Sequence, residues 1–137
     1  MGSQPLMKFL LDTHIWIWIV LEPSRLSQKV AKAVSDPANE LFLSPISVWE
    51  LVMLIQKGRI ALDQDVISWT GQTMQLWQLQ EAPLTTEVAL ETSRLSLVHS
   101  DPSDRLIVAS AKIFDMTLVT ADEKLVALRD IRVLANR

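Results

Sequence analysis

Cysteine is absent from this chain of 137 residues, which excludes disulfides, thiolate metal sites and cysteine nucleophiles. Its absence is compatible with a reducing compartment, and we expect a cytoplasmic protein. Long apolar runs are absent too, since none approaches the roughly 20 residues that a membrane-spanning helix needs. Residues 1–6 are uncharged and unlike a signal peptide, and we expect them to be a tag remnant or a disordered start.

A surplus of basic residues is also missing. The chain has 13 Lys and Arg against 16 Asp and Glu, a formal net charge of -3, whereas nucleic-acid-binding proteins usually carry a basic patch. Hydrophobic residues make up 49% of the chain, and its mean hydropathy is +0.22. We therefore expect a single domain over residues 7–137 with a buried core, whose surplus apolar surface contacts another protein chain.

Short apolar segments alternate with helical patterns along the chain, without an internal repeat or a linker. Strands are expected at residues 8–11, 41–43, 78–82, 116–119 and 131–134. Helices are expected at residues 15–22, 27–35, 45–56, 63–77, 85–95, 103–113 and 123–128. This alternation predicts an α/β fold with one parallel sheet of about five strands and helices on both of its faces.

Four acidic residues occupy comparable places in this pattern. Asp12 and Asp122 lie just past the ends of expected strands, where open α/β sheets bind ligands. Asp104 falls in the first turn of a helix for which Ser103 is the expected cap, and Glu50 is a lone acid in an apolar helix. Each has an ordinary explanation as a capping or exposed residue. Together, however, they are expected to face one edge of the sheet and to converge in one cleft.

Four carboxylates packed closely repel one another and raise one another's pKa unless a cation lies between them. Hard oxygen ligands, without cysteine or a pair of histidines, suit Mg²⁺ or Mn²⁺. Two such ions can activate a water and stabilise the leaving oxygen in an in-line attack on a phosphodiester. The ions would also let an acidic pocket accept phosphate, with basic side chains holding the strand beyond it. Those expected to do so are Arg105, Lys112, Lys57 and Arg59.

Four motifs carry these residues in order along the chain. They are residues 10–13 (LLDT), 44–51 (SPISVWEL), 99–109 (HSDPSDRLIVA) and 118–122 (LVTAD). In order and spacing they resemble the PIN domain and, within that family, the toxins of VapBC-type toxin–antitoxin pairs, over nearly the whole chain. The resemblance implies a three-layer α/β/α fold and a Mg²⁺- or Mn²⁺-dependent endoribonuclease. It also implies a homodimer that is silenced by an antitoxin encoded beside it.

The resemblance further implies a role for each site residue. Asp12, Glu50 and Asp104 would be the principal metal ligands, and Asp122 would complete the pocket. Thr120 would hold Asp12 or a metal-bound water by its hydroxyl. Asp101 would cap or position its loop rather than bind metal. The full set of supporting residues is Thr13, Thr120, Asp101 and Arg105.

The roles of Arg105 and Ser103 stay open. Arg105 could steady the transition-state phosphate or form a salt bridge with Asp101 or a neighbouring acid. Ser103 stands where the family often has an aromatic residue, which puts a substrate contact at that position in doubt. A metal-bound hydroxide needs no histidine base, so His14 and His99 are expected to form hydrogen bonds or to contact RNA. The apolar surplus is expected to form dimer and antitoxin grooves around Trp16, Trp18, Trp49 and Ile55.

Other classes of function fit less well. A receiver-type phosphoacceptor would have an acidic pair near its first strand and a lysine after its last, but Thr13 and His14 follow Asp12 and residues 131–137 contain no lysine. A phosphatase with an aspartate nucleophile would have a second acid where His14 stands. An RNA-processing nuclease without an antitoxin, and a catalytically silent PIN fold that binds partners, are the remaining alternatives.

Overall fold

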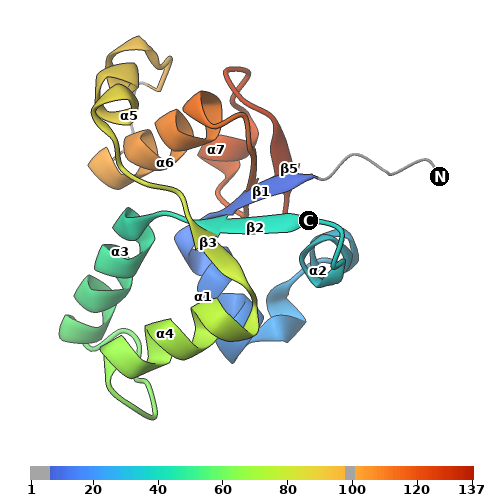
Figure 1. Cartoon of the computed structure of the whole chain (residues 1–137), viewed down its shortest axis with the longest axis vertical. Coiled ribbons are helices and arrows are strands. Elements are labelled where there is room, and N and C mark those ends of the chain that lie inside the picture. The colour runs from blue at the N-terminus through green and yellow to red at the C-terminus, as the bar shows by residue number, and fades with distance from the viewer. Residues whose placement is uncertain (1–6, 98–100) are drawn as a thin grey trace.

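Five strands form one parallel sheet in this computed structural model, which describes residues 7–97 and 101–137. The strands are β1 (Lys8–Leu11), β2 (Glu40–Leu43), β3 (Leu79–Glu81), β4 (Thr117–Thr120) and β5 (Val133–Ala135). They lie in the order β3-β2-β1-β4-β5, and each neighbouring pair is parallel (Figure 1). The predicted α/β fold with a parallel sheet of about five strands is confirmed.

Each α-helix of the described chain begins at a side chain that accepts a hydrogen bond from a backbone N–H of its first turn. The helices are α1 (Thr13–Leu21), α2 (Gln28–Ser35), α3 (Pro45–Gln56), α4 (Val66–Leu76), α5 (Thr86–Glu91), α6 (Pro102–Ile113) and α7 (Glu123–Val126). The capping residues are Asp12, Ser27, Ser44, Asp65, Thr85, Asp101 and Asp122. Short polar residues ahead of each apolar segment therefore decide where the helices start.

Two predicted helix starts are wrong. The helix expected from residue 63 begins at Val66, because Asp65 is the residue that caps it. The cap of α6 is Asp101 and not Ser103, because Pro102 takes the first helical position, where a missing N–H is tolerated. Ser103 is instead buried inside the first turn.

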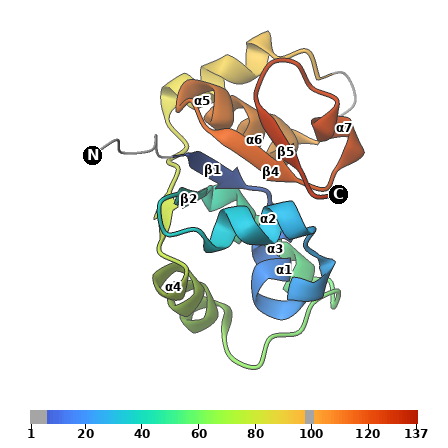
Figure 2. The ribbon, with the colours of Figure 1, turned by 90° about the vertical axis from the view of Figure 1, so that its right-hand side faces the viewer.

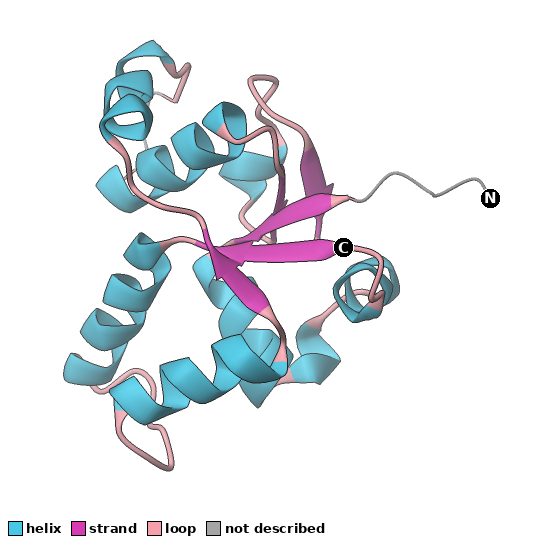
Figure 3. Ribbon diagram, in the orientation of Figure 1, coloured by secondary structure: helices cyan, strands magenta, loops and turns pink. Residues whose placement is uncertain are grey.

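Helices cover both faces of the sheet. Phe9 and Leu11 pack with residues of α1 to α4, whereas Leu10, which points to the opposite face of β1, packs with residues of α5 to α7. Figures 1 and 2 show these two helical groups on either side of the sheet, and Figure 3 shows the strands between them. This is the expected three-layer arrangement. In the described chain, every helix is too short or too polar to cross a membrane.

Trp16 lies in the core and not on the surface. It is 0% exposed, its ring centroid lies 5.3 Å from that of Trp69, and its Nε1 donates to Thr73 Oγ1 at 3.2 Å. The prediction that Trp16 borders a partner groove is therefore wrong. The most exposed large apolar side chains of the described residues lie on α4 and α5, and they are Ile67, Leu76 and Leu90.

An ion pair between a buried glutamate and an exposed lysine joins α5 to α6. Glu91 is 6% exposed, and its Oε1 lies 2.9 Å from Lys112 Nζ, while its Oε2 lies 3.8 Å from Arg94. A buried carboxylate is unfavourable without a partner, so Lys112 stabilises the fold here. Because Lys112 is engaged in this pair, the structure does not support its predicted contact with RNA.

Replacing Lys112 should destabilise the fold without touching the acidic residues of the sheet edge. We expect Lys112→Met to lower the free energy of unfolding by about 2 kcal/mol, because Glu91 would keep only the distant Arg94 as a partner. Urea denaturation at neutral pH measures this change. Arg94→Met is the control, with an expected effect below about 0.5 kcal/mol because Arg94 is exposed. Equal stabilities for wild type and Lys112→Met would contradict the assigned pair.

Candidate active site

Five carboxyl groups line one cavity of about 380 Å3 where β1 and β4 end. β1 lies between β2 and β4 in the sheet. The chain therefore continues from β1 to one neighbour, β2, and later returns to the opposite side of β1 as β4. Such a switch point at the carboxyl ends of the strands is where open α/β sheets bind ligands. The structure thus brings all four predicted acids together and adds a fifth. They are Asp12, Glu50, Asp104 and Asp122, with Asp101 beside them.

Asp12 follows β1 and caps α1. Its Oδ1 accepts the N–H of Thr13 at 2.9 Å, and its Oδ2 accepts the hydroxyl of Thr120 at 2.6 Å. The same Thr120 oxygen accepts the N–H of Asp122 at 3.0 Å, so one threonine joins the ends of β1 and β4. Burial raises the pKa of Asp12, and the hydrogen bonds from Thr120 and Thr13 offset that rise only in part. The predicted contact between Thr120 and Asp12 is present.

Glu50 reaches the cavity from the second turn of α3. The hydroxyl of Thr13 donates to Glu50 Oε1 at 2.5 Å and lies 2.8 Å from Ser47 Oγ. Burial raises the pKa of Glu50, although the bond from Thr13 opposes the rise. Ser47 is fully buried, and the motifs do not single it out. Its position three residues before Glu50, on the same helical face, is the signal that could have identified it.

Asp101 and Asp104 lie at the start of α6. Asp101 Oδ1 accepts the N–H of Asp104 at 2.9 Å and the hydroxyl of Ser103 at 2.8 Å. Partial burial raises the pKa of Asp101, but these hydrogen bonds outweigh it, so the pKa lies below its ordinary value. Burial raises the pKa of Asp104 to about 7, with added repulsion from the other four carboxylates. The cluster thus opposes the negative charge on Asp104 at neutral pH.

Three of the five carboxylates are also helix caps. Asp12 caps α1, Asp101 caps α6 and Asp122 caps α7, where Asp122 Oδ1 accepts the N–H of Lys124 at 2.9 Å. The N-terminus of a helix carries partial positive charge, which favours a nearby carboxylate. Lys124 lines the cavity as well and is a cation that the motifs do not include. Capping explains where these acids stand without excluding a further role.

The donor set suits a hard divalent cation. Its ligating atoms are carboxylate oxygens, and a cation between them would relieve the repulsion that raises the pKa of Asp104. Within residues 7–97 and 101–137, no three acidic or histidine side chains are grouped as they would be to hold one ion. Mg²⁺ does not require such a group, because it keeps several waters and usually binds through one or two carboxylates. The residues present therefore fit Mg²⁺ or Mn²⁺.

Arg105 does not form the salt bridge that was one of its two predicted roles within the described residues. Its guanidinium donates to the carbonyl oxygen of Leu97 at 2.8 Å and to that of Thr92 at 2.7 Å. It therefore ties α6 to the segment that follows α5. An ion pair with Asp101 is not formed in the described chain, and both bonded nitrogens are engaged away from the cavity.

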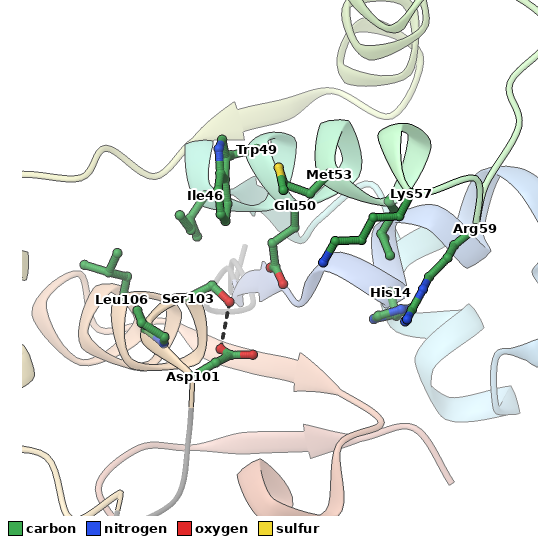
Figure 4. A pocket seen from close by; sticks show the side chains of 12 residues that line it. His14, Ile46, Trp49, Glu50, Met53, Lys57, Arg59, Asp101, Ser103 and Leu106 are labelled. Atoms are coloured by element: carbon green, nitrogen blue, oxygen red, sulfur yellow. Dashed lines mark hydrogen bonds between the residues drawn. The ribbon is translucent and has the colours of Figure 1, made fainter.

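Two predicted basic residues stand beside the acidic site. Lys57 and Arg59 line an adjoining cavity of about 570 Å3, together with Glu50 and His14 (Figure 4). His14 is exposed and borders both cavities, and its ring centroid lies 5.9 Å from that of Trp18. His99, the other histidine of the chain, lies outside the described residues.

Known proteins are similar to this chain over most of its length. The PIN domain family model matches residues 9–131. Ribonuclease VapC22 of Mycobacterium tuberculosis is 38% identical over 117 residues, which cover 85% of this chain and 88% of that protein.

Solved structures show the same fold. The crystal structure of VapBC2 from Rickettsia felis bound to a DNA fragment from their promoter matches with a TM-score of 0.69 at 17% identity, covering 94% of this chain and 98% of that one. VapBC-5 from Mycobacterium tuberculosis, described as a member of the VapBC family of toxin-antitoxin systems, matches with a TM-score of 0.62 at 17% identity, covering 93% and 98%.

The raised pKa of Asp104 makes the stability of the metal-free protein dependent on pH. The folded-state pKa of about 7 lies above the ordinary value of 3.8 for an aspartate, so ionisation of Asp104 opposes folding. The full free energy of unfolding is therefore present below about pH 4, where the carboxyl is protonated. It falls as the pH rises toward and through about 7, where the folded protein must carry the charge. In EDTA at about pH 8, Asp104→Asn should therefore raise the free energy of unfolding by about 1 kcal/mol, a value reduced by solvent screening of this half-buried group.

Urea denaturation of both proteins at about pH 4 and about pH 8 tests this expectation. The difference should be much smaller at the lower pH, where the folded-state carboxyl of Asp104 is protonated and as uncharged as asparagine. Asp63→Asn is the matched control, because Asp63 is exposed and does not line the cavity. A stabilisation by Asp104→Asn that is equal at the two pH values would contradict a charge effect.

Proposed function

This chain belongs to the PIN domain family, and on that premise we propose that it is a Mg²⁺- or Mn²⁺-dependent endoribonuclease, the toxin of a toxin–antitoxin pair. The observation that carries the proposal is the convergence of five carboxylates on one cavity at the switch point of the sheet. The relative named as a ribonuclease supports RNA as the substrate. The acids alone would serve any phosphodiester.

Four carboxylates would hold the metal, either directly or through its waters: Asp12, Glu50, Asp104 and Asp122. When bound, the ion would supply an activated water for attack on the phosphodiester and would offset the charge on the leaving oxygen. Its charge would also reverse the local potential, so that a phosphate can enter a cavity that repels anions when the metal is absent.

The surrounding hydroxyl groups would position these acids. Thr120 fixes Oδ2 of Asp12, and Thr13 fixes Oε1 of Glu50 while leaving its Oε2 for a ligand. Side chains held by such bonds lose little freedom when a ligand binds, which is how a site keeps its reacting groups in place. Asp101 would act indirectly, because it caps the helix that carries Asp104. No histidine is needed as a base in this scheme.

A partner chain is the second part of the proposal. The structural relatives from Rickettsia felis and Mycobacterium tuberculosis are VapBC complexes, which supports a cognate antitoxin for this chain. The exposed Ile67, Leu76 and Leu90 offer apolar surface that an antitoxin or a second copy of the chain would cover. We place the protein in the cytoplasm, as a homodimer, where its RNA substrate is also found.

Loss of one ligand should remove RNA cleavage while the fold survives. We expect wild type to cleave total RNA in millimolar Mg²⁺ or Mn²⁺ and to stop when EDTA is added. Asp104→Asn should lower the rate at least about a hundredfold, because an amide does not carry the charge that holds the ion. Gel analysis of the RNA measures the rate, and Asp63→Asn should cleave like wild type. Undiminished cleavage by Asp104→Asn would show that the assigned site is wrong.

A cognate antitoxin separates the toxin from an RNA-processing nuclease of the same fold. Mixing the wild-type chain with the protein encoded beside its gene should abolish cleavage and yield a larger complex in size-exclusion chromatography. Asp104→Asn should still form that complex, since its apolar surface is unchanged. Full cleavage in the presence of the neighbouring protein, with no change in elution, would favour the processing nuclease.

A further inference from the structure

The groove beside the acidic cavity is built from one face of α3. Its floor includes Ile46, Trp49, Met53 and Lys57, which follow one another at helical spacing, and Glu50 belongs to the same stripe. Pro102 and Leu106 of α6 form part of the facing wall.

The groove has a volume of about 570 Å3 and is continuous with the acidic cavity, because both are lined by Glu50, Asp101 and His14.

One end of this groove is apolar and exposes a large aromatic ring. Trp49 is 54% exposed, although Trp16 and Trp69 are at most 3% exposed. Ile46 and Leu106 lie with Trp49 to one side of the Glu50 carboxylate (Figure 4). The acidic chemistry uses none of these side chains. An exposed tryptophan next to a site that acts on phosphodiesters is suited to stack on a nucleobase.

The other end of the groove is cationic. Lys57 and Arg59 lie to the opposite side of Glu50 in Figure 4, and both are exposed. Neither forms an ion pair within the described residues, whereas Arg25, Lys112 and Arg132 each do. In a chain whose net charge is -3, two cations at one end of a groove mark a place for an anion.

From this order along α3 we infer that a single strand of RNA lies in the groove, with one base stacked on Trp49 and a phosphate beyond the cleaved bond held by Lys57 and Arg59. The inference rests on the proposed ribonuclease function and adds its substrate-binding contacts. Glu50 lies between the two ends, so the cleaved phosphodiester would lie between the stacked base and the held phosphate. A base reaches the face of a tryptophan only when it is unpaired, so the substrate is a loop or another single-stranded segment.

The charge of the groove favours RNA over a protein segment as its occupant. An apolar peptide would account for the exposed ring of Trp49 but would leave Lys57 and Arg59 without an anionic partner. A nucleotide chain offers both a flat apolar base and a phosphate, one for each end. The second possibility, an antitoxin segment in the same groove, is an outcome of the test below.

An abasic scan tests the stacking contact. An oligoribonucleotide spanning a site that the enzyme cleaves in total RNA is made with one base removed at a time, and kcat/KM is measured for each. With wild type, removal of one base beside the cleaved bond should lower kcat/KM about tenfold or more. Trp49→Ala should lower kcat/KM on the intact oligonucleotide by a similar factor and become insensitive to that missing base. Trp49→Phe, which keeps a ring, should recover part of both effects.

The cationic contact has its own readout. Lys57→Ala and Arg59→Ala should each reduce the slope of log kcat/KM against log salt by about one, measured on the same oligonucleotide with the metal present. Lys32→Ala is the control at an exposed position that does not line the groove, and it should behave like wild type. A duplex containing the same cleavage site should be cut much more slowly by wild type.

The outcomes separate the two proposals. Failure of wild type to cleave any RNA with metal would overturn the proposed function and this inference with it. Cleavage by wild type, with Trp49→Ala as sensitive to every missing base as wild type, would overturn only the inference. Unaltered cleavage by Trp49→Ala together with lost inhibition by the neighbouring protein would assign the groove to the antitoxin instead.

Discussion

The acidic site depends on one hydrogen bond between two strand ends, from Thr120 Oγ1 to Asp12 Oδ2. Burial opposes the charge of Asp12, so that carboxylate needs a donor, and the same threonine oxygen accepts the N–H of Asp122. The bond exists only because β1 and β4 pair with Leu11 opposite Val119. A slip of one residue would turn alternate side chains to the other face and separate these groups. The register of two central strands thus sets the geometry of the acids.

The acids that cap helices are the same ones to which we assign the chemistry of the proposed function. In a parallel sheet the helices begin where the strands end, so their partial positive charges meet at one edge. Asp12, Asp101 and Asp122 use these ends as caps, which lets the fold bring carboxylates close together. The negative charge of Asp104 is the least compensated of the five, as its pKa of about 7 indicates. A divalent ion would neutralise the negative charge of the carboxylates that the helix N-termini do not compensate.

Local patterns predicted the frame of the site but not the partners of its side chains. Asp12 and Asp122 could be found because an acid just past an apolar strand lies at the carboxyl edge of a parallel sheet, where ligands bind. Arg105 could not be assigned, since its two carbonyl partners belong to a segment whose path depends on tertiary packing. Trp16 and Trp18 lie on a helix that is apolar nearly all round, so its pattern could not tell the buried ring from the partly exposed one.

The bond between Thr120 and Asp12 spans 108 residues of sequence. A contact this remote forms only after the intervening chain has been made and folded back, and loops of that length close slowly. A chain still on the ribosome has exposed Asp12 early, but it lacks β4, Asp122 and the threonine that joins them until synthesis has passed residue 122. The acidic centre is therefore assembled late, so a nascent chain that has not passed residue 122 does not carry the complete acidic site beside the RNA that encodes it.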